Sequence, residues 1–447
     1  MYTSKNKELY LNNGYKFRFH KLLAGNVERW CCAKKTCSAF FKKKSDGEMS
    51  EITCHNHEPE NSHTLQRQIL SNRLKRKAVD ELCERPAKIL HTEITSEELN
   101  TLNGYDVSLI RKNIHHARSA ILPPRPKSFA ELHVTLETFP LKTKLDENFL
   151  FINDSVNNIV GFTTPSNLKY LTNCEAMFVD GTFRSVPVLF QQLFVIHGFK
   201  NFSYVPLVFF LLPSKETSMY IKAFENLKNH TWKVPSTIYI DFEIAIHTAV
   251  LKVWPNMQVK GCRFHLGQAW YRKIQSLGLS NNYKVKDDEV GAFLRIFFGL
   301  PFLPPQEVED CFVEDLMAIQ PQHDGVVKFC DYIVENYIDT RSSFPPALWA
   351  EFSNSLTRTT NACESFHSKL NNMFYQAHPN IYVLTNALLE IQTSSYTKMK
   401  QFRQRMPKIL ETKLKFLSAV NEEFMTKSCD RFQFVKKISW KFLPISL

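Results

Sequence analysis

The segments AMFVDGTF at residues 176–183 and TIYIDFEI at residues 237–244 decide the fold. In each, a short run rich in apolar and aromatic residues ends in an aspartate, Asp180 or Asp241, which is typical of a strand whose last side chain emerges at a sheet edge. Similar runs predict further strands at 149–152, 189–197 and 204–212, and helical patterns follow at 219–229 and 245–253. The sequence therefore predicts an α/β domain with a mixed central sheet.

Taken singly, either aspartate favours an ordinary turn or helix cap, because Asp is common at strand ends for that reason. The two become informative together with their neighbours. Four motifs follow one another along the chain: DGTF at 180–183, DFEI at 241–244, GCRFHL at 261–266 and TNACESFH at 360–367.

In their order and flanking residues, these motifs strongly resemble the Mutator-like element (MULE) transposases, from about residue 149 to about residue 372. The resemblance implies an RNase H-like catalytic domain over residues 148–375. It also implies a DDE triad, with Asp180 on the first strand, Asp241 after the fourth and Glu364 on a later helix.

Three carboxylates suit phosphodiester transfer, because charge must be stabilised on both the attacking and the leaving oxygen. Two Mg²⁺ or Mn²⁺ ions can supply that stabilisation, and hard cations prefer oxygen ligands. We therefore expect Asp180, Asp241 and Glu364 to be both the catalytic and the metal-binding residues. Glu243 is an alternative ligand, although its place in a first helical turn favours an interaction with the helix dipole.

The stretch between Asp241 and Glu364 is longer than a simple fold of this class needs, and residues from about 285 to 350 predict an all-helical insertion. In the resembling family such an insertion helps to hold DNA ends. The weak candidate contacts here are Arg272, Lys273 and Arg295, although basic residues on helices are usually just solvated.

Two further features of this region have no settled role. A second zinc site is one interpretation of Cys262, His265, Cys363 and His367, but buried Cys and hydrogen-bonded His are the commoner outcome. Residues 376–447 predict a C-terminal helical region that ends in an aromatic, basic tail at 432–442. Packing against the main domain and self-association would explain that tail equally well.

Near the N-terminus, Cys32, Cys37, His55 and His57 form a tetrahedral zinc set with C-x4-C and H-x-H spacing. The first spacing fits a loop between two strands, and the second fits a strand, whose period of two places both imidazoles on one face. A module of this size has too small a core to be secure without such a metal. The alternative is ordinary buried Cys and surface His.

The same module resembles the FLYWCH zinc fingers in GYKF at 14–17, WCC at 30–32, CSA at 37–39 and HNHEP at 55–59. The resemblance implies a small all-β, DNA-binding zinc finger over residues 8–60. Spacing favours Cys32 over the adjacent Cys31 as ligand. Phe40 and Phe41 are expected in the core, and phosphate contacts are expected from five lysines, unless these form only a solvated edge: Lys34, Lys35, Lys42, Lys43 and Lys44.

Between the finger and the large domain, residues 64–126 predict a basic helical segment with a break near Pro86 and a helix start at 96–98. The run RLKRK at 73–77 is a candidate nuclear localisation patch or DNA contact, although a solvated helix face is the default for so short a cluster.

The bulk composition agrees with a nucleic-acid partner. The chain has 447 residues, 44% of them hydrophobic, a net charge of +12 and a pI near 9.0, which favours a polyanionic partner. Its densest apolar stretch, 204–212, is too short to span a bilayer, and its start lacks a secretory signal. We expect an intracellular protein, located in the nucleus, with no membrane association.

The function predicted from the sequence is that of a cut-and-paste DNA transposase. Its partners would be terminal inverted repeats and target DNA, and synapsis of two ends would require a homo-oligomer. Its cofactors would be structural Zn²⁺ and catalytic Mg²⁺ or Mn²⁺. The alternative is a host-recruited, transposase-derived DNA-binding protein or regulator without transposition activity; an RNase H-like nuclease acting on another nucleic acid is a third hypothesis.

Overall fold

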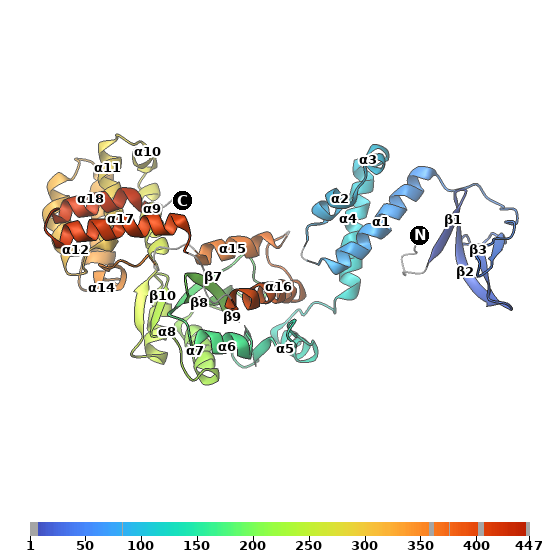
Figure 1. Ribbon diagram of the computed structural model, residues 1–447, viewed down its shortest axis with the longest axis horizontal. Helices are drawn as coiled ribbons and strands as arrows, with labels where there is room; N and C mark the ends of the chain where they lie inside the picture. Colours follow the sequence, from blue (N-terminus) through green and yellow to red (C-terminus); the bar gives the residue numbers. More distant parts are fainter. Residues whose placement is uncertain (1–7, 83, 357–361, 375, 401–405, 444–447) are drawn as a thin grey trace. The chain divides into compact units, whose positions relative to one another are not determined.

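The computed structural model describes residues 8–82, 84–356, 362–374, 376–400 and 406–443. Thr360 and Asn361, the first two residues of the TNACESFH motif, lie outside these ranges. The chain divides into two compact units: an N-terminal unit made mainly of the residues up to Arg125, and a C-terminal unit that begins at Pro126 (Figure 1). None of the helices in the described ranges is long and apolar enough to cross a membrane.

The N-terminal unit begins with a four-stranded antiparallel sheet in the order β1-β2-β3-β4. Its strands are β1 (Leu9–Asn12), β2 (Tyr15–Leu23), β3 (Val27–Cys32) and β4 (Phe40–Lys43). Phe17, Trp30 and Phe41 form the core of this sheet. Phe40 is only half-buried and lies under the guanidinium of Arg29, 4.1 Å from its ring centre. The prediction of an all-β module is confirmed, but only Phe41 belongs to its core.

In the described part of the N-terminal unit the sheet is followed by four helices: α1 (Ser62–Asp80), α2 (Pro86–Glu93), α3 (Ser96–Thr101) and α4 (Gly104–Ile121). A capping box between Thr95 and Glu98 begins α3 where the sequence predicted a helix start. Apolar residues of α1, α2 and α4 form one core, which includes Leu70, Leu74 and Ile110.

Two of the four basic residues in the run at 73–77 on α1 are neutralised within this unit. The guanidinium of Arg73 lies 2.8 Å from Glu98, and the Lys77 ammonium lies 2.6 Å from Glu93. These contacts disfavour the use of Arg73 and Lys77 in binding an external polyanion.

The C-terminal unit is built on a seven-stranded sheet in the order β11-β10-β7-β8-β9-β6-β5. Its strands are β5 (Leu150–Asp154), β6 (Ile159–Phe162), β7 (Ala176–Thr182), β8 (Gln192–Lys200), β9 (Ser203–Leu212), β10 (Thr237–Ile240) and β11 (Gln258–Gly261). β10 is parallel to both β7 and β11, whereas the other pairs are antiparallel, so the predicted mixed sheet is confirmed. The sequence located five strands but missed β6 and β11.

Helices cover the two faces of this sheet (Figure 1). The flanking helices are α5 (Phe129–Thr138), α6 (Pro165–Leu171), α7 (Thr217–His230), α8 (Ile244–Val253), α15 (Ala362–Asn372) and α16 (Ile381–Met399). α7 and α8 share a core with Met177 and Val179 of β7, on one face. On the other face, Cys363 of α15 packs with Phe178 of β7 and Tyr239 of β10.

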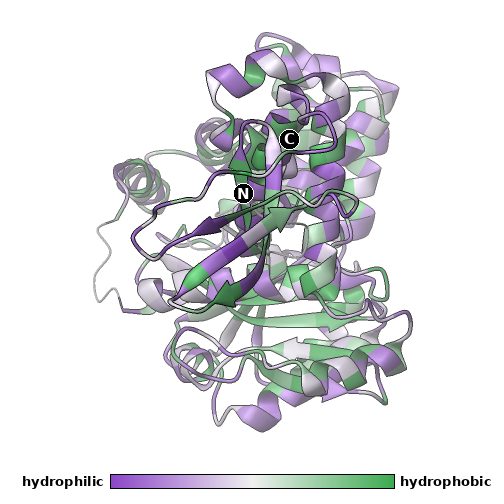
Figure 2. Ribbon diagram, turned by 90° about the vertical axis from the view of Figure 1, so that its right-hand side faces the viewer, coloured by the Kyte–Doolittle hydropathy of each residue, from purple (hydrophilic) through white to green (hydrophobic). Residues whose placement is uncertain are grey.

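The remaining helices form a helical lobe with a single core. They are α9 (Arg263–Ser276), α10 (Ser280–Lys284), α11 (Glu289–Ile296), η1 (Phe297–Phe302), α12 (Glu307–Asp310), η2 (Cys311–Leu316), η3 (Met317–Ile319), α13 (Asp324–Ile333), η4 (Val334–Ile338), α14 (Pro346–Trp349), α17 (Lys408–Met425) and α18 (Arg431–Lys441). Many carry a hydrophobic stripe beside a hydrophilic one (Figure 2).

The aromatic tail at 432–442 forms most of α18 and packs into this lobe. Phe434 and Val435 are buried in its core, and Arg431 lies 2.7 Å from both Glu314 and Asp315. Of the two explanations that the sequence left open, packing within the chain accounts for this tail.

Gly299 tests that packing, because a Cβ atom at this position would overlap the carbonyl oxygen of Val435 on α18. We expect Gly299→Ala to lower the free energy of unfolding by about 1–3 kcal/mol, the range for an overpacked core, measured by chemical denaturation. Gly104→Ala is the control, because nothing lies within 4 Å of a Cβ atom there. Equal effects of the two substitutions would contradict the packing of α18 on η1.

Candidate functional site

Strand alternation places the two aspartates on one face of the sheet. Phe178 of β7 and Tyr239 of β10 are register partners, and their rings stack with centres 4.4 Å apart. Asp180 and Asp241 each follow one of these aromatic residues by two positions, and side chains two apart in a strand point to the same face. Because β7 and β10 are parallel, both carboxylates reach the same end of the sheet.

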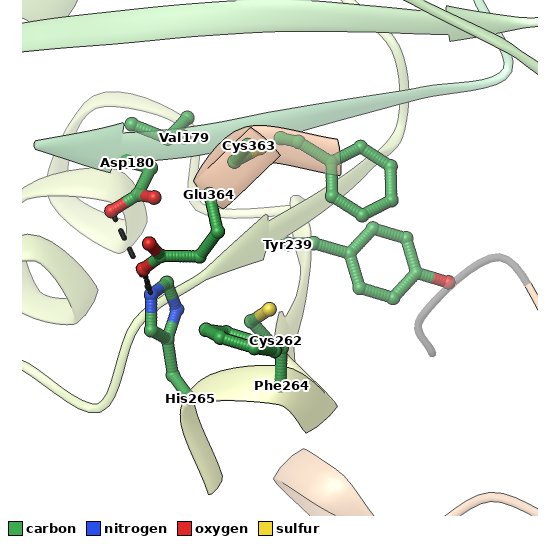
Figure 3. A pocket seen from close by; sticks show the side chains of 9 residues that line it. Val179, Asp180, Tyr239, Cys262, Phe264, His265, Cys363 and Glu364 are labelled. Atoms are coloured by element: carbon green, nitrogen blue, oxygen red, sulfur yellow. Dashed lines mark hydrogen bonds and ion pairs between the residues drawn. The ribbon is translucent and has the colours of Figure 1, made fainter. Parts of the chain in front are cut away.

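Two helices bring the other members of the site to these aspartates. His265 lies in the first turn of α9, immediately after β11, and Glu364 lies in the first turn of α15. Nε2 of His265 lies 3.2 Å from Oε1 of Glu364 and 3.8 Å from Oδ1 of Asp180, and its Nδ1 lies 3.7 Å from Oδ1 of Asp241. One imidazole therefore contacts all three predicted carboxylates, two of which appear with it in Figure 3.

A second histidine approaches Asp180 from α15. Nδ1 of His367 lies 3.3 Å from Oδ2 of Asp180, and both side chains are buried. Oδ2 nevertheless accepts no hydrogen bond from the described residues. A buried carboxylate oxygen that accepts no hydrogen bond is left with its lone pairs unsatisfied, as expected of an oxygen that binds a cation.

The electrostatics of the site show a shortage of positive charge. Burial raises the pKa of Asp180 to about 7, and nearby Glu364 adds to this effect. Burial opposes the charged form of His265, but Cys262 and Glu364 outweigh it and raise the pKa of His265 to about 12. Burial also lowers the pKa of His367 to about 4. The hydrogen bond from His265 lowers the pKa of Glu364, and the charge of Arg272 adds to this effect. Among the described residues, the His265 imidazolium is the cation in contact with all three carboxylates.

The donor atoms of Asp180, His265 and Glu364 all lie within 4.8 Å of one another and could hold a metal ion. Carboxylate oxygens suit Mg²⁺ or Mn²⁺, and the imidazole adds a nitrogen donor. Asp241 is not part of this group. Its Oδ1 accepts a hydrogen bond of 2.6 Å from the Phe242 amide. Its contact with His265 still places it beside the group.

The N-terminal cysteines and histidines also come together. Sγ of Cys32 lies 3.3 Å from Nε2 of His57, and Sγ of Cys37 lies 3.5 Å from Nδ1 of His55. Zinc bond lengths give a sulfur–nitrogen edge of about 3.5 Å in a tetrahedral site, so these separations fit one zinc ion. Among the described residues, Cys31 is not part of the group.

Surrounding groups prepare three of these four side chains for a metal, whereas burial raises the pKa of the Cys32 thiol. Burial opposes the Cys37 thiolate, but the backbone N–H groups of Asn56 and Ala39 outweigh it and lower the pKa of this thiol. Nδ1 of His57 lies 2.8 Å from the carbonyl oxygen of Glu58, which leaves the lone pair on Nε2. Burial lowers the pKa of His55, so its imidazole stays neutral.

The strand predicted for the H-x-H segment is wrong. His55 and His57 lie in an irregular segment after β4, and neither belongs to a strand. The ring of Tyr15 orients His55 instead, stacked at 3.7 Å, while the side chain of Asn56 donates to the carbonyl of Thr36. Two residues at a period of two are too few to establish a strand.

The structure does not support a second zinc site at Cys262, His265, Cys363 and His367, which form no ligand group. Sγ of Cys363 faces Nδ1 of His197 at 3.7 Å, while His265 turns to the carboxylates. His197 was not predicted as part of the site, because it lies within an apolar strand and belongs to no motif.

Other predicted contacts have structural partners. Glu243 is held by Lys215 at 2.7 Å and by the Tyr220 hydroxyl at 3.0 Å, so it is an engaged side chain at the start of α8. Arg295 is buried and donates to the carbonyls of three residues, Tyr283, Val285 and Lys286. The prediction of Arg295 as a DNA contact is therefore wrong, whereas Arg272 is exposed.

The fold and the site together define a mixed α/β domain with a candidate divalent-metal centre at one end of its sheet. Residues 176–269 match the MULE transposase domain family, which indicates a transposase-type domain. The match runs from β7 into α9 and includes Asp180, Asp241 and His265, but neither Glu364 nor the N-terminal module. A search of curated proteins found no match.

Zinc analysis of the purified chain tests the N-terminal cluster. We expect about one zinc ion per chain, lost in Cys37→Ser because three ligands hold the ion poorly. Cys31→Ser and Cys54→Ser are matched controls that should keep the ion. Loss of zinc in Cys31→Ser would contradict the assignment, and zinc retained by Cys37→Ser would indicate another site.

Proposed function

We propose that this chain is a cut-and-paste DNA transposase of the MULE type, with Asp180, Asp241 and Glu364 as its catalytic DDE triad. One observation carries the proposal. Three acidic residues from three separate motifs, spread over more than 180 positions of sequence, approach the single imidazole of His265. Two of them lie within the segment that matches the transposase family.

The arrangement of strands supports an RNase H-like fold for the core of this domain. Counted from β7, Asp180 lies on the first strand, Asp241 directly follows the fourth, β10, and Glu364 lies on a later helix. These are the positions that the resemblance to MULE transposases implies. The helices from α11 to α14, residues 289–349, lie between the second and third acidic residues, within the stretch of about 285–350 where a helical insertion was expected.

In this proposal Asp180 and Glu364 hold a divalent cation together with His265, and Asp241 completes the second half of the centre. Bound Mg²⁺ or Mn²⁺ would activate the attacking oxygen and stabilise the leaving one. The buried Asp180 fixes the depth of the centre, and Glu364, more than a third exposed at its side chain, faces the side from which DNA would approach. When no cation is bound, the His265 imidazolium holds the carboxylates together.

Recognition of DNA is assigned to the N-terminal module as a FLYWCH-type zinc finger. Lys34, Lys35 and Lys42 are exposed there, and the net charge of +12 supports a polyanionic partner. Terminal inverted repeats and target DNA are the proposed ligands, in the nucleus, with a homo-oligomer joining two ends.

Cleavage of DNA that carries candidate terminal inverted repeats, in Mg²⁺ or Mn²⁺, tests this function. Asp180→Asn and Glu364→Gln should each lower the cleavage rate by about 1,000-fold or more, because each removes a charged ligand at the reacting phosphate. DNA affinity should stay nearly unchanged. Gel analysis of products and fluorescence anisotropy measure the two quantities.

Glu243→Gln is the matched control, because this carboxylate lies nearby but is occupied by Lys215 and Tyr220. It should keep most of the activity. Intact binding without any cleavage by the unmodified chain would exclude the enzyme, and loss of both cleavage and binding in Asp180→Asn would make that residue structural.

A further inference from the structure

The exposed face of α4 differs from the basic run at 73–77 on α1, because its basic residues are not in ion pairs among the described residues. Buried residues lie along one side of the helix, where Asp106, Ile110, Ile114 and Arg118 face the unit's core. The opposite side is exposed and polar, and its members recur every three or four positions: Tyr105, Ser108, Arg111, Lys112, His115, His116 and Ser119. At 3.6 residues per turn they share an arc of about 140°.

This face carries basic residues without any acidic neighbour on the same helix. The only acidic residue of α4, Asp106, is buried and engaged by Arg67 and by His63, at 3.0 Å from each. Among the described residues, Arg111 and Lys112 take part in none of the ion pairs. Their charges are therefore available to an external anion.

The contrast with α1 makes this availability informative. The basic run of α1 is more conspicuous in the sequence, yet Arg73 and Lys77 are paired with Glu98 and Glu93. The buried Arg118 is also used internally, since it donates to the carbonyls of Ala78 and Glu81 at the end of α1. Arg73 and Lys77 are thus neutralised within the unit, whereas Arg111 and Lys112 on α4 remain available to an external anion.

The size of the face suits duplex DNA. From Tyr105 to Ser119 it extends about 21 Å at 1.5 Å per residue, and the major groove, about 12 Å wide, admits one α-helix. Arg111 and Lys112 can neutralise phosphates, while the hydroxyls and imidazoles along the same face can donate hydrogen bonds to DNA. A protein surface as partner would gain little, because the face offers a single large side chain with apolar character, Tyr105.

We propose that the exposed face of α4, centred on Arg111 and Lys112, is a second DNA-binding surface, distinct from the zinc finger. The inference rests on the proposed function, because that function makes DNA the partner. It adds a duplex contact in the helical segment that precedes the large domain. The two DNA-binding parts would then read one stretch of duplex through separate contacts.

The test is the salt dependence of binding by the full chain to a labelled random-sequence DNA duplex, without added divalent cation so that no cleavage intervenes. Arg111→Gln combined with Lys112→Gln should weaken binding by roughly 10- to 100-fold near 0.1 M salt. The slope of log K against log salt should fall by about 1.8, or about 0.9 for each lost phosphate contact.

Two controls separate charge from structure. Lys408→Gln with Lys415→Gln removes the same charge from exposed positions of α17 and should leave the slope unchanged. Arg111→Lys with Lys112→Arg keeps both charges and should retain binding. Equal losses in the charge-keeping and charge-removing variants would overturn the proposal, because the effect would then be structural.

The failure of this inference is distinguishable from the failure of the proposed function. An unchanged slope in the Arg111→Gln/Lys112→Gln variant, with binding lost in Cys37→Ser, would overturn the role of α4 and leave the zinc finger as the DNA-binding part. If the slope falls in this variant but the unmodified chain never cleaves DNA, the role of α4 in binding would be supported and the transposase function would be excluded. No binding of duplex by the unmodified chain would overturn both.

Discussion

The parallel pairing of β10 with β7 is the constraint on which the candidate centre depends. It aligns Phe178 with Tyr239, so the residues two positions further along, Asp180 and Asp241, emerge at one end of one face. A shift of one residue in this register would turn one aspartate towards the core shared with α7 and α8. The apolar residues on that opposite face, such as Val179 and Ile240, are therefore as necessary to the site as its acids, because their burial fixes the register.

The charges at the centre impose a second requirement. A buried carboxylate is costly unless it is neutralised or paired, and Asp180 is almost fully buried. Its neighbours are two further carboxylates, so the cluster requires a cation. His265 provides one, and its raised pKa shows that acidic surroundings favour its charged form despite burial. A divalent ion would neutralise the same carboxylates with more charge. This explains why either the imidazolium or a metal ion can balance this group of carboxylates.

Sequence patterns predicted the parts of this fold that are long and periodic. The strand that contains Asp180, which continues to Thr182, and the strand before Asp241 were found because apolar runs are strong signals. β11 was missed, since QVKG is short and contains one apolar side chain, although it positions His265. The four residues of the N-terminal Cys/His cluster were predicted from spacing, but the support of His55 by Tyr15 was not, because that contact joins residues 40 positions apart. For the same reason the central position of His265 could not be read from the sequence.

The third acidic residue of the site, Glu364, lies in a part of the chain that is held by contacts between residues far apart in the sequence. Glu364 lies on α15, between the insertion helices and the C-terminal helices that close their common core. Contacts such as that of Arg431 with Asp315 join residues 116 positions apart, so this lobe is complete only when α18 has packed. Such non-local contacts form late, because the entropy of closing a long loop must be overcome first. The approach of Glu364 to Asp180 joins residues 184 positions apart, whereas Asp180 and Asp241 are brought together by the pairing of β7 with β10.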